Sequence, residues 1–311
     1  MTDKPLKDAL KNVSINTIIS KEIPSSTSQH QHTNQHNQQH THQQEWQVLK
    51  QFTAARIAIG RAGISTPTQA MLDFQLAHAQ AQDAVHLPLN SSELLTEFEK
   101  FPIINRDHAN VIQLHSQVKD RAEYLQRPDL GRLLNKESTH KLQNVNKEQE
   151  GFDLAIVIVD GLSSLAIQKN AAEFLSIFYQ KINDDAASKD LKTMTLAPLT
   201  LVSQGRVAIG DEVAQTLHAQ SVLVLIGERP GLSSPDSLGL YYTYSPKKGL
   251  TDEARNCISN VRQDGLSFSQ AAGKAFYLLK ESHRRKISGV NLKEDHNEHA
   301  LNHDLNSIEA I

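Results

Sequence analysis

The pattern of apolar and polar positions along the chain changes near residue 151. From there on, largely apolar runs occupy residues 152–164, 196–207 and 221–227, and segments with helical spacing occupy 165–184, 210–220 and 268–286. Strands that alternate with helices in this way predict βαβ units with right-handed crossovers and a mostly parallel sheet. Because the apolar runs are continuous rather than alternating, each strand should be covered on both faces. The second half of the chain is therefore expected to be an α/β domain.

Residues 46–150 have a different pattern, which predicts a mainly helical region. A helix is expected to begin with Thr66 as its N-cap and Pro67 in its first position, and apolar residues then recur at helical spacing. Residues 113–135 also have helical character. Pro128 interrupts it, because the residue before a proline is disfavoured in the α region.

The two ends of the chain are expected to lie outside the folded part. Residues 24–45 are dense in Gln, His, Ser and Thr, so they predict a flexible linker. Its histidines are interpreted as adventitious metal affinity rather than a functional metal site. In residues 1–23, apolar residues recur at helical spacing, which is typical of an amphipathic docking or targeting segment but also fits a frayed terminus. Residues 294–311 are polar and predict a flexible tail.

Composition narrows the classes of function. The 311 residues carry a net charge of −3 and only 5% aromatic residues, which disfavours a nucleic-acid-binding protein. Cys257 is the single cysteine, so an internal disulfide is excluded and a reducing compartment is expected. No apolar run reaches the length of a membrane span, and the N-terminus lacks the apolar core of a secretory signal. We therefore expect a soluble, cytoplasmic protein.

A candidate binding edge follows from the ends of the three predicted strands. These ends carry Asp160-Gly161, Gly205-Arg206-Val207 and Gly227-Glu228-Arg229. In an open parallel sheet, ligands bind beyond the carboxyl ends of the strands at a topological switch point. The three ends should therefore meet at one edge. The same charged residues would also suit solvated loops or an internal ion pair.

Short motifs that would assign a chemistry are absent from the sequence. It has no glycine-rich dinucleotide or phosphate loop after a strand, no Gly-x-Ser-x-Gly elbow and no His-Glu-x-x-His pair. The pattern around Cys257 favours a buried small apolar side chain over a reactive thiol. From the residues alone, the chain is an α/β binding domain of unknown ligand.

Six collinear blocks carry a resemblance to a known family. They are GRAGISTPTQAMLDFQLAHAQAQDAV, YLQRPDLGRLL, IVIVDGLSSLAIQ, GRVAIGDEV, VLIGERPGLSSPDSLGLYYTYSP and RNCISNVRQDGLS. From about Arg56 to Leu292 the chain resembles the small (light) subunit of ethanolamine ammonia-lyase. The histidine-rich linker and the residues after Lys293 lie outside the resemblance.

The resemblance implies an activity, a cofactor and a partner. Enzymes of this family split ethanolamine into acetaldehyde and ammonia with adenosylcobalamin, whose cobalt–carbon bond breaks homolytically to give an adenosyl radical. Their large subunit, a TIM barrel, holds the substrate and the catalytic side chains. Their small subunit helps to clasp the cobalamin at the subunit interface through a Rossmann-like domain, which would be residues 151–293 here.

For this chain, the resemblance implies a cofactor-binding subunit of a hetero-oligomer, without a catalytic residue of its own. The positions that match the family's cobalamin contacts are Val207, Glu228 and Cys257. The expected fold is α/β, a Rossmann-like mostly parallel sheet domain preceded by a mainly helical N-terminal region. No histidine has an aspartate two residues before it, which fits the base-on cobalamin binding of this family. Because an N-terminal segment directs some members into a bacterial microcompartment, residues 1–23 are a candidate for that role.

Two other classes of function stay open at this point. One is a stand-alone Rossmann-like enzyme or binding protein for a nucleotide-like ligand, with Glu228 or Cys257 as base or nucleophile. The lack of a recognisable histidine partner for either residue counts against it. The other is a scaffold that recruits a partner through its N-terminal segment.

Overall fold

The computed structural model describes residues 48–50, 52–53, 55–107, 111–145, 151–189 and 194–293. The predicted segment 1–23, the linker 24–45 and the tail 294–311 lie outside these residues and stay predictions. The chain divides into two units, residues 1–60 and 61–311. In the first unit residues 48–50 are helical, and all the elements named below belong to the second.

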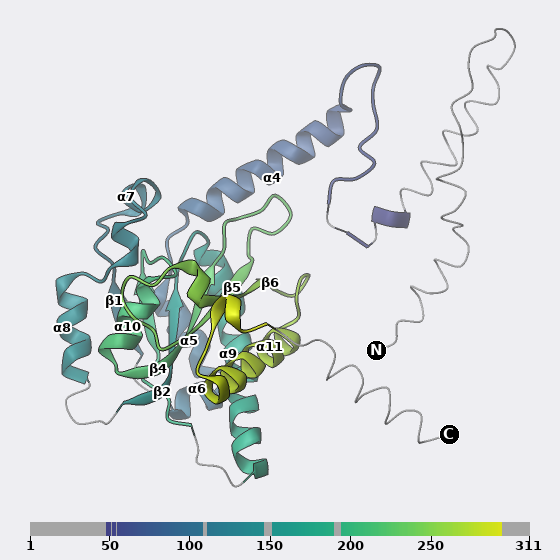
Figure 1. The fold of residues 1–311 in the computed structure, drawn as a ribbon. Helices are drawn as coiled ribbons and strands as arrows, with labels where there is room; N and C mark the ends of the chain where they lie inside the picture. Colours follow the sequence, from purple (N-terminus) through teal and green to yellow (C-terminus); the bar gives the residue numbers. More distant parts are fainter. Residues whose placement is uncertain are drawn as a thin grey trace, which may run out of the picture. The chain divides into compact units, whose positions relative to one another are not determined.

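A six-stranded sheet lies at the centre of the second unit, as far as its residues are described (Figure 1). Its strands are β1 (Ile112–His115), β2 (Phe152–Val159), β3 (Thr200–Ser203), β4 (Ala219–Gly227), β5 (Leu238–Tyr244) and β6 (Arg255–Val261), in the order β1-β3-β2-β4-β5-β6. Strands β1 to β4 pair in parallel, and β5 and β6 extend the sheet antiparallel. The predicted α/β class is confirmed, whereas the Rossmann-like assignment stays a prediction.

Helices cover both faces of this sheet (Figure 1). Helices α5 (Ser91–Glu99), α6 (Pro102–Asp107), α9 (Ser164–Lys189) and α11 (Phe268–Arg285) pack on one face, and α8 (Lys136–Val145) and α10 (Ile209–Thr216) on the other. Along β2 the two cores alternate: Leu154, Ile156 and Ile158 enter the first, and Ala155, Val157 and Val159 enter the second. Burial on both faces therefore explains the continuous apolar run, as predicted.

The chain order creates a switch point next to β2. From β2 the chain crosses through α9 to β3 on one side, and from β3 it returns through α10 to β4 on the other side of β2. At such a point the loops leaving neighbouring strands diverge to opposite faces and leave a crevice. The remaining elements of the unit, as far as it is described, are α4 (Thr68–His86), α7 (Arg121–Gln126), η1 (Leu130–Arg132), η2 (Asp252–Ala254) and η3 (Gly289–Asn291).

Strand β1 lies in the region that the sequence predicted to be mainly helical, so that prediction is incomplete. Ile112 and Leu114 are buried in the core beneath α8 and α10, whereas Gln113 is exposed. The strand pairs with β3, which lies far along the sequence. Four residues carry too little pattern to identify a strand, and tertiary pairing decides their conformation. The predicted boundary at residue 150 stays a prediction, although β1 and β2 share one sheet.

Two other predicted details are corrected. Helix α4 begins at Thr68 with Pro67 in the N-cap position, where no side-chain cap bond is made, so Thr66 does not cap the helix. In the second apolar run only Thr200–Ser203 forms a strand, β3, and Leu196 adds an isolated bridge to Leu154 of β2. The residues after β3 form the turn that leads into α10.

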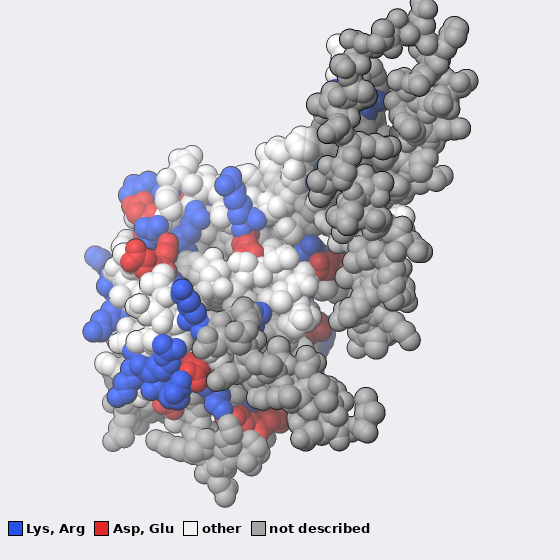
Figure 2. All heavy atoms as spheres, turned by 45° about the vertical axis from the view of Figure 1, so that its right-hand side comes forward, with Lys and Arg blue, Asp and Glu red and all other residues white. Residues whose placement is uncertain are grey.

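Charged side chains on the surface are mixed in sign. On the face drawn in Figure 2, basic and acidic side chains lie beside one another, with uncharged surface between them. An intermixed face of this kind does not create the single-sign field that steers binding to polyanions. Each helix in the described part of the chain is too short or too polar to cross a bilayer.

His283 should give the fold a pH dependence. Its ring lies half-buried in the last turn of α11, edge-on to Tyr244 with 5.4 Å between centroids. Its Nε2 atom lies 3.0 Å from the hydroxyl oxygen of Ser221. Burial lowers the pKa of His283, and the Asp153 carboxylate opposes that shift. The folded state therefore resists protonation, whereas the unfolded chain takes up a proton near its ordinary pKa of 6.5.

We expect the free energy of unfolding to fall as the pH drops below this value, because only the unfolded state gains the proton at His283. Urea unfolding at several values between about pH 5 and pH 8 measures the effect. The wild type should lose more stability over this range than the His283→Gln variant, which has no titrating group at position 283. Parallel curves for the two proteins would contradict the prediction.

Candidate functional site

A cavity of about 530 Å³ lies beyond the carboxyl ends of the parallel strands. The segments that leave β2, β3 and β4 contribute Leu162, Arg206, Val207, Ala208, Ile226, Gly227, Glu228 and Arg229 to its lining. The other lining residues are Tyr124, Pro128 and Arg132 from the α7–η1 segment, Tyr241 from β5 and Asp252 from η2. The cavity therefore occupies the crevice that the switch point next to β2 predicts.

Two glycines let the carboxyl ends of β2 and β4 come together at this edge. Gly161 has a φ of +62°, and a Cβ placed there would lie 2.3 Å from the carbonyl oxygen of Gly227. At Gly227 itself, a Cβ would lie 1.9 Å from the carbonyl oxygen of Ser163, at the start of α9. A side chain at either position would collide with the neighbouring backbone, so only glycine lets the two strand ends approach this closely.

Glu228 follows β4 directly and is held by one of its two oxygens. Its Oε2 accepts a short hydrogen bond from the hydroxyl of Ser237 and another from the backbone N–H of Asn260 at 3.2 Å. The Oε1 atom has no hydrogen-bond partner among the described residues. Glu228 therefore presents a fixed carboxylate with one oxygen available as an acceptor at the wall of the cavity.

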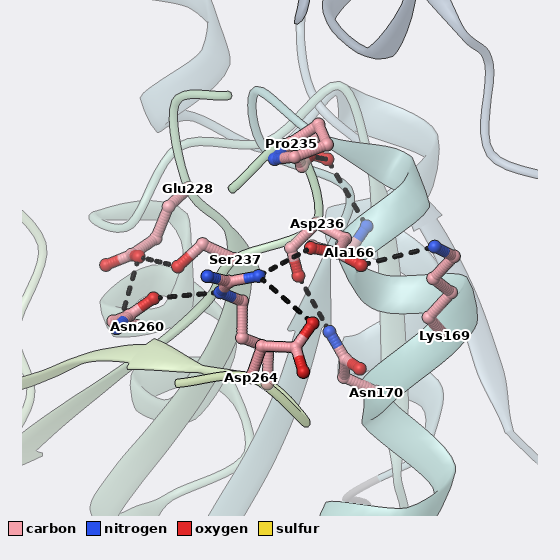
Figure 3. A network of polar contacts seen from close by, with 11 residues as sticks. Ala166, Lys169, Asn170, Glu228, Pro235, Asp236, Ser237, Asn260 and Asp264 are labelled. Atoms are coloured by element: carbon pink, nitrogen blue, oxygen red, sulfur yellow. Dashed lines mark hydrogen bonds and ion pairs between the residues drawn. The ribbon is translucent and has the colours of Figure 1, made fainter. Parts of the chain in front are cut away.

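A polar network behind Glu228 fixes the loop between β4 and β5 (Figure 3). Asn260 accepts a hydrogen bond from Nε of Arg262 at 3.1 Å, and Arg262 pairs with Asp236 at 3.7 Å. On the other side, Asp236 pairs with Lys169 of α9 at 3.2 Å, and its carbonyl oxygen accepts from the side chain of Asn170 at 2.7 Å. The loop that follows Glu228 is thus tied to both β6 and α9.

Val207 lies in the turn between β3 and α10 and lines the same cavity as Glu228. Its side chain packs partly against the core on the α10 face. The backbone N–H groups of Val207 and Ala208 have no acceptor within the part of the chain that is described. The sequence predicted that Val207 and Glu228 lie at one edge of the sheet, and in the structure both residues line one cavity.

Cys257 lies outside the lining of this cavity. It is exposed on β6, which corrects the expectation of a buried apolar side chain, and its Sγ lies 3.3 Å from the hydroxyl oxygen of Ser259. It pairs across the sheet with Tyr241, which does line the cavity. Burial raises the pKa of Tyr241 well above its usual range, and the neighbouring Cys257 adds to the rise. Cys257 is thus one strand beyond the cavity rim.

Asp160 and Arg229, two further charged residues of the predicted edge, differ in burial. Asp160 is buried, and its carboxylate accepts backbone hydrogen bonds from Gly161 at 2.8 Å, Gln204 at 2.8 Å and Gly205 at 3.1 Å. Burial raises its pKa, and these hydrogen bonds oppose the rise. Asp160 therefore holds the ends of β2 and β3 together, which is a structural role. Arg229 is exposed and lines the cavity.

Sequence reasoning missed the wall formed by the α7–η1 segment. Tyr124 lies between two arginines, with the Cζ of Arg206 at 4.1 Å and that of Arg121 at 4.5 Å from its ring centroid. Arg132 completes this wall. The block YLQRPDLGRLL contains Tyr124 and Arg132 and could have pointed to this wall. Its residue pattern, however, predicts only a helix that is interrupted by proline.

The described ranges contain no group of three or more His, Cys, Asp or Glu side chains that could hold a metal ion. The histidines of the predicted linker 24–45 lie outside those ranges. What the cavity offers is one free carboxylate oxygen, two free backbone donors and several guanidinium groups. Such a set can bind and orient a polar ligand.

Comparisons with known proteins identify relatives of the chain. Residues 43–293 match the family model described as "Ethanolamine ammonia-lyase light chain (EutC)". The chain is 51% identical to the ethanolamine ammonia-lyase small subunit of Pseudomonas putida strain W619, over 84% of this chain and 92% of the relative. It is also 51% identical to the small subunits of Xanthomonas campestris pv. campestris strain B100, over 85% and 93%, and of Pseudomonas fluorescens strain Pf0-1, over 80% and 87%.

Proposed function

The chain belongs to the ethanolamine ammonia-lyase light-chain family, and from this premise we propose that it supplies one wall of an adenosylcobalamin site that the large subunit completes. The complex would convert ethanolamine to acetaldehyde and ammonia. The observation that carries the proposal is the meeting of Val207 and Glu228 at one cavity, with a free acceptor oxygen on Glu228. Both residues match cobalamin contacts of the family.

The chemistry of the cavity suits cobalamin. This cofactor has a rim of amide side chains and a nucleotide tail with ribose hydroxyls, all of which can donate hydrogen bonds. Oε1 of Glu228 is an acceptor for one such donor, and the backbone at Val207 allows close contact with another part of the ligand. Cys257 is proposed to contact the cofactor where it extends past Tyr241 onto the exposed face of β6.

The size of the cavity supports a shared site. Pockets that enclose drug-sized ligands measure about 300–1,000 Å³, and cobalamin is several times larger than such ligands. A cavity of about 530 Å³ therefore accommodates only part of it. We propose that the large subunit covers the rest of the cofactor.

A protein partner is also supported by the surface of α4. This helix is buried only through three alanines in its second half. Four large apolar residues, Met71, Leu72, Phe74 and Leu76, are exposed on it, with Leu76 at 60%. Several exposed large apolar side chains on one helix are typical of a protein–protein contact. We propose that the partner is the large subunit and that the assembly is a hetero-oligomer.

This chain is proposed to bind and orient the cofactor without a catalytic residue of its own. The radical chemistry would come from homolysis of the cobalt–carbon bond in the bound cofactor. The stand-alone enzyme is disfavoured because Oε2 of Glu228 is occupied by two donors and the thiol of Cys257 contacts the hydroxyls of Ser259 and Tyr241. Neither residue has a histidine within hydrogen-bond distance in the described residues.

Size-exclusion chromatography with detection at the corrinoid absorbance tests the proposal. The chain, the large subunit and their equimolar mixture are each incubated with cyanocobalamin before the run. We expect corrinoid to co-elute with a complex of both subunits and to separate from the chain run alone. Full retention by the chain alone, or no retention by a formed complex, would contradict the shared site.

A location inside a bacterial microcompartment is proposed for the N-terminal segment 1–23, by the family precedent. Deleting these residues from a fluorescently labelled enzyme should disperse it through the cytoplasm, because the sheet and the cavity lie in residues 61–311 and are left intact. Catalytic activity in extracts should be retained. An unchanged distribution in cells would remove the targeting role.

A further inference from the structure

The ladder between β5 and β6 contains an irregularity near the end of β6. The register shifts between Leu238 and Leu240 of β5, where two residues of β6, Ser259 and Asn260, lie opposite one residue of β5. Such a bulge takes a residue out of the regular ladder and gives it a new direction. Asn260 has a left-handed φ of 59°, which asparagine tolerates better than most residues. The ladder alone therefore does not fix Asn260.

The displaced residue supplies one of two donors that meet on Glu228 (Figure 3). The N–H of Asn260 donates to Oε2 of Glu228 at 3.2 Å, and the hydroxyl of Ser237 donates to the same oxygen. Asn260 is exposed, so packing does not hold it. Its carbonyl oxygen accepts from the N–H of Leu266 at 2.8 Å. What remains to be held is its side chain.

Arg262 connects the segments that carry these two donors. Its Nε donates to the side-chain oxygen of Asn260 at 3.1 Å, and its Nη1 lies 3.7 Å from the carboxylate of Asp236, the residue before Ser237. The Arg262 side chain is only 11% exposed, and it is not among the described residues that line the cavity. A planar guanidinium holds two partners in a fixed relation, which an ammonium group does not. One side chain thus relates both donors of Glu228 to each other.

We propose that Arg262 is a positioning residue for Glu228. It acts through Asn260 and Asp236, which fix the two donors to Oε2, and it thereby directs the free Oε1 into the cavity. The inference deepens the proposed function, and its binding test rests on that function. The orientation of Glu228 itself is a property of this chain and can be measured without a ligand.

The other charged contacts of this network supply a matched control. Lys169 of α9 pairs with the same Asp236 at 3.2 Å, but in the described residues it contacts neither donor of Glu228. Asp264 lies 3.9 Å from Arg262 and is 87% exposed, so its pairing contributes little. Lys169→Gln therefore removes one partner of Asp236 and leaves the link between the donors in place.

Amide hydrogen exchange in the full chain tests the positioning without a cofactor. We expect Arg262→Gln to speed exchange at the N–H of Asn260 about 3–10-fold, because the side chain of Asn260 loses its anchor and opens more often. Exchange at Ile258, a buried residue of β6 that pairs regularly with β5, should not change. Lys169→Gln should change neither rate. An unchanged rate at Asn260 in Arg262→Gln, or an equal rise at Ile258, would overturn the proposal.

A double-mutant cycle on the complex of both subunits tests the consequence for binding. We expect Arg262→Gln to raise the Kd of cyanocobalamin about 3–10-fold, because it misdirects one hydrogen bond. In a Glu228→Ala background the same substitution should add less than about twofold, since Arg262 acts only through Glu228. An equal fold-change in both backgrounds would assign Arg262 a general role in the fold and contradict the positioning role.

Asn260→Gly is a second variant that disturbs the fold less. It removes the side chain that Arg262 holds but keeps the N–H donor, and glycine adopts the left-handed φ without cost. We expect the same direction of change in Kd as in Arg262→Gln, and no further loss when the two substitutions are combined. Losses that multiply would show that Arg262 does not act through Asn260.

Failure of the proposed function would give a different pattern. In that case the wild-type complex does not bind cyanocobalamin. The exchange measurement still decides the positioning role: a faster rate at Asn260 in Arg262→Gln with an unchanged rate at Ile258 upholds it, and no change at Asn260 overturns it.

Discussion

Replacing Asp211 with alanine should lower the free energy of unfolding by about 3–5 kcal/mol, because the substitution leaves the buried guanidinium of Arg255 without its counter-ion. Asp211 in α10 forms a short ion pair with Arg255 of β6, and their side chains are only 1% and 2% exposed. The guanidinium also donates to the carbonyl oxygens of Thr251 and Leu250, at 2.5 and 3.1 Å. Carbonyl oxygens alone do not neutralise its charge, and Asp211 is its only buried counter-ion among the residues that the structure describes.

The pKa of Asp211 indicates which partner of the ion pair causes the loss of stability in Asp211→Ala. Burial raises that pKa to about 6, although Arg255 opposes the rise. Ionised Asp211 is therefore itself unfavourable in the fold, and the loss on substitution comes from the unpaired Arg255. It follows that a double variant, Asp211→Ala with Arg255→Met, should be more stable than Asp211→Ala alone.

Urea unfolding near pH 8, where the carboxyl is ionised, measures these differences. Asp252→Ala is the matched control, because Asp252 also pairs with Arg255 but is 96% exposed. That substitution should cost at most about 1 kcal/mol. A loss in Asp211→Ala no larger than in Asp252→Ala would show that the buried pair does not fix α10 against β6.

Replacing Glu228 with glutamine should weaken cobalamin binding by the complex about 10–100-fold, the equivalent of one charge-assisted hydrogen bond. The geometry determines which atom changes. The oxygen that faces Ser237 and the N–H of Asn260 must remain an acceptor, so the amide oxygen of the glutamine takes that place. The NH₂ group then replaces Oε1, and the free acceptor at the cavity becomes a donor.

Titration of the complex with cyanocobalamin measures this loss, with Glu253→Gln as the control. Glu253 is an exposed carboxylate in η2 that does not line the cavity, so its replacement should leave the Kd unchanged. Ser237→Ala removes a donor that positions Oε2 of Glu228, and a smaller loss of severalfold is expected from it. An unchanged Kd in Glu228→Gln would remove Glu228 from the site.

The sequence predicted the parts of the fold that depend on local pattern. The continuous apolar runs of β2 and β4 indicated strands buried on both faces, and α9 and α11 followed from their helical spacing. Strand β1 was missed because its partner β3 is supplied by a distant segment. Such pairing is a tertiary property that four residues do not encode locally.

The sequence predicted the part of the candidate site that follows from the parallel strand order, and it missed the part that depends on individual tertiary contacts. Val207 and Glu228 meet because parallel strands bring their carboxyl ends to one edge. Asp160 sits at the same edge but is structural, since three backbone N–H groups converge on its carboxylate. Neither this convergence nor the packing of Arg206 on Tyr124 can be predicted from the spacing of residues along the chain, because both arise from tertiary contacts.

The most direct test of the shared cofactor site is release of acetaldehyde from ethanolamine in the presence of adenosylcobalamin. The assay compares this chain alone, the large subunit alone and the two mixed at equal concentration. We predict activity only in the mixture, because each protein covers part of the cofactor. Activity of either protein alone at the level of the mixture would contradict the proposal that this chain supplies a necessary wall of the site.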